Sequence, residues 1–137
     1  MTTKNDCCGG GKTNVVLACS GGSNVGQMTN EAAKRLDMMG DGKFFCLAGV
    51  GGQISSMVTS VKGADKVLVL DGCPVGCGKK CAELAGVTGY HHLVVTELGI
   101  EKKHVYDLSE ADLAKTVEAS RRLLGTSVKG KTCTCRG

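Results

Sequence analysis

The segment DKVLVLDG (65–72) constrains the fold of this chain more than any other feature of its sequence. Four consecutive aliphatic residues, Val67 to Leu70, follow one another without a polar residue between them. A strand with one solvent-facing side alternates apolar and polar residues, whereas a strand of a parallel sheet is covered on both faces. The segment therefore predicts a buried strand in a parallel sheet.

Strand-like and helix-like segments alternate along the chain. Three further apolar segments are expected to form strands: 14–19, 43–50 and 92–98. Helical patterns cover 24–38, 53–63, 74–85 and 109–124. Ser109 is expected to cap the last helix and Gly125 to end it. Because strands that alternate with helices form βαβ units, we expect an α/β fold: a Rossmann-like three-layer αβα sandwich with a mostly parallel sheet of about four or five strands.

The length of the chain fits one such domain. With 137 residues it can bury an adequate core without disulfide bonds. We expect an α/β domain over 14–125, an N-terminal tail over 1–13 and a C-terminal tail over 126–137. Each tail contains a pair of cysteines, Cys7 with Cys8 and Cys133 with Cys135.

Charge and hydropathy argue against two classes of partner. The formal net charge of +4 is too weak and too scattered to indicate nucleic-acid binding. No apolar run reaches the length of a membrane span, and the first residues lack the apolar segment of a signal peptide. We therefore expect a cytoplasmic protein that binds neither nucleic acid nor membrane. An unknown protein or small-molecule partner and assembly into a homo-oligomer both remain open.

The most unusual feature of the composition is the content of nine cysteines. In a cytoplasmic chain, such a density indicates metal or thiol chemistry more than disulfides. Cys19 ends the predicted strand 14–19, Cys73 follows the strand 65–72, and Cys46 lies within the strand 43–50, near its carboxyl half. Because ligands bind outside the carboxyl ends of parallel strands, we expect three chain segments to bring a thiol to one edge of the sheet.

The stretch CPVGCGKKC (73–81) places three cysteines four residues apart. In a helix that begins at Pro74, residues four apart rise about 6 Å and face the same side, whereas residues eight apart rise about 12 Å. Cys73 and Cys81 then cannot bind one metal ion. We prefer the pair of Cys73 and Cys77, with Cys73 as the helix cap, where backbone N–H groups stabilise a thiolate. Cys81 is expected to pack in the core.

Cys19, Cys46, Cys73 and Cys77 would together form an all-cysteine site with four ligands. Such a set suits a zinc ion, and ligand type alone does not separate zinc from an iron–sulfur cluster. A reactive thiol pair for electron or sulfur transfer is a further alternative. Core packing is the competing explanation for each thiol, above all for Cys46 and Cys81. Whether the protein is an enzyme remains open.

Polar residues near the strand ends are candidates for binding a ligand beside the thiols. The turn CSGGSNVGQ (19–27) could offer backbone N–H groups to an anion, with Ser20, Gly21 and Ser23 as binding residues, or only pack closely around a metal site. Asp71 is expected to bond N–H groups of its own turn or to support a thiolate ligand. His91 and His92 are expected at the amino end of the fourth strand, in solvated or capping roles away from the cysteines.

Three segments, LACSGGSNVGQ, CLAGVGG and LDGCPVGCGKK, resemble the DGC domain family, which is named after its Asp-Gly-Cys motif. The resemblance runs from Val15 to Lys103 and includes HHLVVTELGIEKK. Members are described as zinc-binding proteins of unknown function, so the resemblance implies a zinc ion as cofactor. It also implies the four ligands Cys19, Cys46, Cys73 and Cys77. Five cysteines are additional to the family pattern: Cys81, Cys7, Cys8, Cys133 and Cys135.

The cysteine pairs of the two tails allow a second hypothesis. If the termini meet, the two pairs could form another four-thiolate site within one subunit or between subunits. They could equally be flexible thiols that pass metal, sulfur or electrons to the central site. Incidental thiols in disordered tails are the remaining alternative.

Overall fold

A computed structural model of the chain describes residues 13–126. The four tail cysteines, and with them the hypothesis of a second thiolate site, lie outside the described residues. The described part begins and ends at the amino edge of the sheet, where Thr13, Asn14 and Thr126 line one surface hollow.

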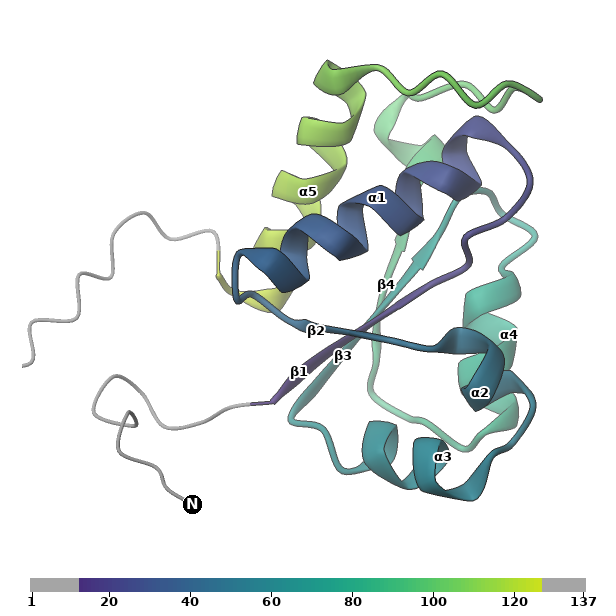
Figure 1. The fold of residues 1–137 in the computed structure, drawn as a ribbon, viewed down its shortest axis with the longest axis vertical. Coiled ribbons are helices and arrows are strands. Elements are labelled where there is room, and N and C mark those ends of the chain that lie inside the picture. Colours follow the sequence, from purple (N-terminus) through teal and green to yellow (C-terminus); the bar gives the residue numbers. More distant parts are fainter. Residues whose placement is uncertain (1–12, 127–137) are drawn as a thin grey trace, which may run out of the picture.

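The described strands form a single parallel sheet. They are β1 (Asn14–Ala18), β2 (Lys43–Phe45), β3 (Lys66–Asp71) and β4 (His91–Val94), in the order β2-β1-β3-β4. Every neighbouring pair is parallel, with Leu17 opposite Phe45 and Val69 opposite His92. The sheet places β1 and β3 at its centre and β2 and β4 at its edges (Figure 1).

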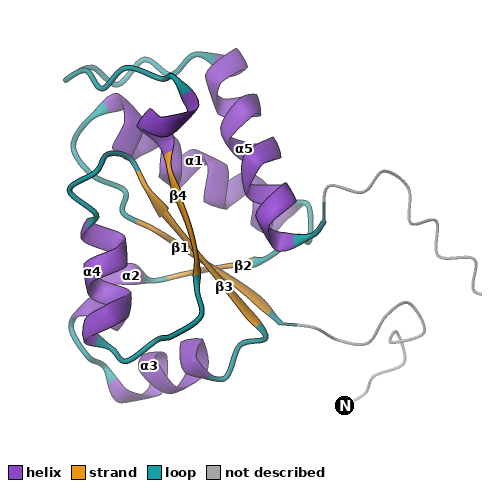
Figure 2. Ribbon diagram, turned by 180° about the vertical axis from the view of Figure 1, so that it is seen from behind, coloured by secondary structure: helices purple, strands orange, loops and turns teal. Residues whose placement is uncertain are grey.

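Helices cover both faces of this sheet, which makes a three-layer αβα sandwich (Figure 2). One layer contains α1 (Asn24–Met38) and α5 (Glu110–Leu124); the other contains α2 (Leu47–Gly51), α3 (Ser55–Lys62) and α4 (Cys77–Leu84). A short 3₁₀ helix, η2 (Val95–Leu98), follows β4. The predicted α/β fold class is confirmed, with four strands in the described part of the chain.

The aliphatic run of β3 serves both layers of helices. Leu68 and Leu70 are fully buried in the core under α1 and α5, whereas Val67 and Val69 lie in the core under α2, α3 and α4. Successive side chains of a strand point to opposite faces, so a strand covered on both sides needs an apolar residue at every position. This is why the segment shows no alternation.

The ends of the long helices follow their local sequence. Ser109 caps α5 by accepting a hydrogen bond from the Asp112 N–H, and Gly125, at a φ of 76°, ends the helix in the left-handed conformation. α1 covers the predicted range, and its cap, Ser23, accepts a bond from the Gly26 N–H.

Two predicted strands are too long. The strand predicted over 43–50 ends at Phe45, and the next residues form α2, whose Val50 is fully buried against the sheet. The strand predicted over 92–98 begins at His91 and ends at Val94, where η2 takes over. Both errors have the same cause: a short apolar run has no period that distinguishes a strand from a buried helix.

Candidate functional site

After the two central strands, β1 and β3, the chain forms helices on opposite faces of the sheet. From β1 the chain passes through α1 to β2, and from β3 it passes through α4 to β4, on the opposite face. In open parallel sheets a ligand crevice forms at such a point, outside the carboxyl ends of the strands. The crevice here is a cavity of about 220 Å³, and Cys19, Cys73 and Cys77 belong to its lining.

Glycines let the N-terminus of α1 approach these strand ends closely. A Cβ at Gly26 would lie 2.5 Å from the carbonyl oxygen of Gly21, and a Cβ at Gly72 would lie 2.7 Å from the backbone nitrogen of Gly26. Neither distance is compatible with a side chain, because both contacts are to backbone. The Asp-Gly-Cys sequence therefore needs glycine at its centre so that α1 can pack against the turn before Cys73.

Cys19 lies directly after β1. Its N–H donates to the Leu70 carbonyl at 2.9 Å, and its Sγ lies 3.4 Å from the Gly72 N–H, which donates to it. Ser20 follows with a φ of 52°, a conformation that costs energy for any residue but glycine. The Thr29 hydroxyl of α1 holds it there by accepting the Ser20 N–H at 3.0 Å.

The three candidate binding residues of this turn, Ser20, Gly21 and Ser23, line two different cavities. Gly21 and Ser23 line the 220 Å³ cavity together with Cys19. Ser20 instead lines a second, larger cavity on the β2 side of β1.

The turn after β3 differs from the predicted helix cap. α4 begins at Cys77, and its cap is Gly76, whose φ of 71° is left-handed. The segment from Cys73 to Gly76 is a turn in which the Gly76 N–H donates to the Cys73 carbonyl at 3.2 Å. The prediction that Cys73 caps the helix is wrong, because Gly76, two residues after Pro74, turns the chain before the helix starts. Cys77 therefore lies at the helix N-terminus.

A second consequence concerns Cys73 and Cys81. The argument that they cannot share one ion required a regular helix between them, and that helix does not begin until Cys77. The separation between Cys73 and Cys81 therefore depends on the turn over 73–76 as well as on the first turn of α4. Cys73 has another neighbour, since the Lys102 ammonium donates to its Sγ at 3.4 Å. Lys102 stands 29 residues from Cys73 in the chain, so no local pattern could have revealed the contact.

Asp71 is buried at the end of β3 and anchors α4. Its carboxylate accepts the N–H groups of Gly78 at 2.6 Å and Lys79 at 3.0 Å, and Nε2 of His92 lies 2.7 Å from Oδ2. The expected bonds to its own turn are thus bonds to the first turn of α4. Gly78 permits the approach, because a Cβ there would lie 2.9 Å from Oδ1 of Asp71.

His92 does not have the solvated role expected for it. The parallel register pairs it with Val69 and pairs Asp71 with Val94, so His92 and Asp71 point to the same face of the sheet. β4 begins at His91, one residue earlier than predicted, so His92 lies inside the strand rather than at its start.

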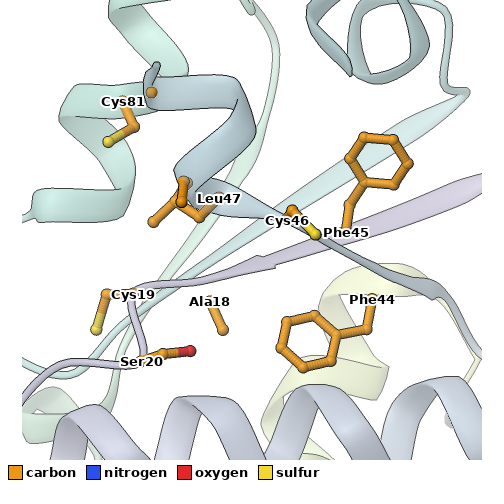
Figure 3. Close-up of a pocket in the computed structure, with 10 residues that line it drawn as sticks. Ala18, Cys19, Ser20, Phe44, Phe45, Cys46, Leu47 and Cys81 are labelled. Carbon is orange, nitrogen blue, oxygen red and sulfur yellow. The ribbon is translucent and has the colours of Figure 1, made fainter. Parts of the chain in front are cut away.

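The second cavity, of about 640 Å³, lies where β1 and β2 separate, and three cysteines line it (Figure 3). Cys19 follows β1, Cys46 caps α2, and Cys81 lies on α4. Cys46 is exposed rather than inside a strand, since β2 ends before it. Cys81 is half-buried and lines the cavity, so its predicted place within the core is wrong. Burial, and then the neighbouring Cys77 and Asp71, raise the pKa of the Cys81 thiol.

All five described cysteines are free and lie at the carboxyl edge of the sheet. Cys19, Cys73 and Cys77 share the smaller cavity, and Cys46 shares the larger one with Cys19 and Cys81. Within residues 13–126, however, no three side chains of the His, Cys, Asp or Glu type come close enough to hold a metal ion. Figure 3 shows why for the larger cavity: its three sulfur atoms do not point toward one another.

Residues 15–120 match the model of the DGC domain. The chain belongs to the DGC domain family. It is also 37% identical over 110 residues to the anaerobic and virulence modulator AnvM of Pseudomonas aeruginosa, a match that covers 80% of this chain and 84% of that protein. No solved structure matches the chain. The helices of the described part are too short or too polar to cross a membrane.

Proposed function

We propose that this protein binds a zinc ion through cysteine thiolates at the point where β1 and β3 diverge. The observation that supports this most is the lining of the 220 Å³ cavity, to which two strand ends and one helix N-terminus contribute Cys19, Cys73 and Cys77. Thiolates are the ligands that zinc favours in sites without open positions. A zinc ion bound there would tie the ends of the two central strands together.

Each of the three thiols lies beside a hydrogen-bond donor or at a helix N-terminus. The Gly72 N–H donates to Sγ of Cys19, and the Lys102 ammonium donates to Sγ of Cys73. Cys77 is the first residue of α4, where the helix dipole stabilises negative charge. Once deprotonated, the three sulfur atoms would be the ligands of a thiophilic cation, with these donors around them.

Cys46 is the fourth ligand in this proposal, and it requires a movement. Its thiol lines the neighbouring cavity, beside Cys19. Cys46 is exposed and caps α2, a helix of five residues, without a side-chain hydrogen bond that would fix its rotamer. Bringing the thiol toward the other three therefore requires a change of rotamer and a shift of α2, whose Val50 is fully buried.

The alternative is a redox centre at the same edge, either an iron–sulfur cluster or a reactive thiol pair for electron or sulfur transfer. The contact between Lys102 and Cys73 favours the reactive-thiol version, because a nearby cation increases the thiolate fraction that reacts. Free thiols also persist best in a reducing compartment, which supports the proposed cytoplasmic location.

The relative from Pseudomonas aeruginosa is named an anaerobic and virulence modulator. Thiolates bound to zinc lose the ion when they are oxidised, so a four-cysteine site suits a protein that responds to oxygen. We therefore propose a regulatory role in metal handling or redox response for this chain rather than a catalytic one.

The test is the metal content and visible spectrum of the full-length chain purified without oxygen. The proposal expects a colourless protein with about one zinc per chain, and loss of that zinc in the Cys73→Ser/Cys77→Ser variant. A Cys81→Ser variant is the matched control, because Cys81 is a thiol of the same edge outside the proposed ligand set, and it should keep the zinc.

The tail thiols need their own control. A variant with serine in place of all four tail cysteines should retain the zinc. A brown protein that contains iron and sulfide would overturn the zinc proposal in favour of the cluster. Zinc that is lost with the tail cysteines and kept in Cys73→Ser/Cys77→Ser would overturn the proposed site.

A further inference from the structure

The 640 Å³ cavity exists because two neighbouring strands differ in length. β2 ends at Phe45, which pairs with Leu17, whereas β1 continues through Ala18. Beyond Leu17, the β2 side of β1 has no strand partner, and the chain after Cys46 turns away into α2. The gap between the strand end and the helices α2 and α4 is the cavity (Figure 3).

The lining of this cavity is apolar and uncharged. The sequence contains two phenylalanines and no tryptophan, and both phenylalanines, Phe44 and Phe45, lie here. Among residues 13–126, none of the side chains that line it is an Asp, Glu, Lys, Arg or His, and Ser20 supplies the one hydroxyl.

We propose that this cavity binds a small, neutral molecule of apolar character, at a site beside the proposed zinc centre, with which it shares Cys19 and Cys46. Its volume falls within the range of about 300–1,000 Å³ that is typical of small-molecule pockets. Phe44 and Phe45 lie on opposite faces of the sheet, and aromatic rings and polarisable sulfur atoms both pack well against apolar ligands.

The same lining excludes other occupants. A phosphate-bearing or otherwise charged ligand would lose its hydration without finding an opposite charge. A peptide would bring an N–H and a C=O with each residue, and the Ser20 hydroxyl cannot satisfy more than one or two of these groups. A small molecule with few polar atoms is the ligand that remains.

The experiment uses N-phenyl-1-naphthylamine, a neutral fluorophore that brightens in apolar surroundings, as the probe for the full-length chain. The Ala48→Glu variant places a carboxylate on the cavity wall at an exposed position, where it should not disturb folding. We expect its affinity for the probe to fall at least about tenfold, because burying a charge costs more than the 1.4 kcal/mol that a tenfold change represents. The matched control is Leu84→Glu, which adds the same charge at a side chain that is 64% exposed and outside the cavity.

Amide chemical shifts give the second measurement. Shifts caused by the probe should gather on residues 18–20 and 44–48, and they should persist in Cys73→Ser/Cys77→Ser, which removes two proposed zinc ligands but no residue of this cavity. The proposal is wrong if the wild-type protein does not brighten the probe, if Ala48→Glu binds it as well as Leu84→Glu does, or if the shifts centre on the exposed side chains of Val75 and Leu84.

Discussion

Oδ2 of Asp71 lies 2.7 Å from Nε2 of His92, and this contact ties β4 to the carboxyl end of β3. The same carboxylate accepts two N–H groups from the first turn of α4, the helix that begins with Cys77. One buried side chain thus fixes the position of a helix and, through it, of a thiol. The aspartate of the Asp-Gly-Cys sequence thus supports the site, and it also belongs to the lining of the 220 Å³ cavity.

Replacing Asp71 should therefore destabilise the fold. The Asp71→Ala variant leaves the N–H groups of Gly78 and Lys79 and the His92 ring without their partner, and we expect a loss of about 2–4 kcal/mol in the free energy of unfolding. Urea denaturation measures this. His92→Gln, which removes only one of the three contacts, should cost less, and equal losses in both variants would contradict the proposed anchoring of α4.

The close contact between α1 and the turn after β3 predicts a strong effect at Gly72. A Cβ there would lie 2.7 Å from the Gly26 nitrogen, so Gly72→Ala must push two backbone segments apart. We expect a destabilisation of about 1–3 kcal/mol, as for other overpacked sites. Gly63→Ala is the control, since its Cβ would lie 3.4 Å from the Thr59 carbonyl. A Gly72→Ala protein as stable as Gly63→Ala would mean that the packing is looser than described.

The contact between the Lys102 ammonium and Cys73 leads to a prediction about how fast Cys73 is alkylated. Lys102→Met removes the cation that lies 3.4 Å from its Sγ. Alkylation of Cys73 by iodoacetamide at neutral pH should slow by roughly two- to fivefold, the range that an exposed charge contact of up to about 1 kcal/mol gives. Peptide mass spectrometry follows the rate. Lys103→Met should leave it unchanged, because Lys103 contacts α1 through its backbone N–H and carbonyl.

The raised pKa of Cys81 predicts that the Cys77 and Cys81 thiols of α4 are alkylated at different rates. Burial raises the pKa of Cys81 above its ordinary value, so iodoacetamide should modify it more slowly than the exposed Cys77 at mildly alkaline pH.

The same shift has a consequence for stability. The folded state holds the Cys81 proton more tightly than the unfolded state does, so unfolding becomes easier as the pH rises from the ordinary thiol pKa through the raised one. This loss should disappear in Cys81→Ser. A pH profile that is identical in both proteins would contradict the assignment.

The sequence predicted the sheet and the long helices because their signals are local. The unbroken run of β3 needed only its own residues to indicate two covered faces, and Ser109 and Gly125 mark the ends of α5 by their own chemistry. The candidate site depended on features that no segment contains alone. Gly76 moves the start of α4 past Cys73, and the register of β4 brings His92 to Asp71.

The expected place of Cys46 shows the same limit. Its apolar neighbours suited a strand, and only the burial of Val50 against the sheet makes the segment a helix. The strand therefore ends earlier, Cys46 becomes exposed, and the gap beside β1 opens.

The central claim is that zinc binds to four thiolates at the point where β1 and β3 diverge. X-ray absorption at the zinc edge, on zinc-loaded protein in which the four tail cysteines are serine, tests it most directly. The account predicts a first shell of four sulfur atoms at about 2.3 Å, reduced in the additional Cys46→Ser variant and intact in Cys81→Ser. A shell of nitrogen and oxygen atoms, or four sulfur atoms that persist without Cys19 and Cys46, would contradict it.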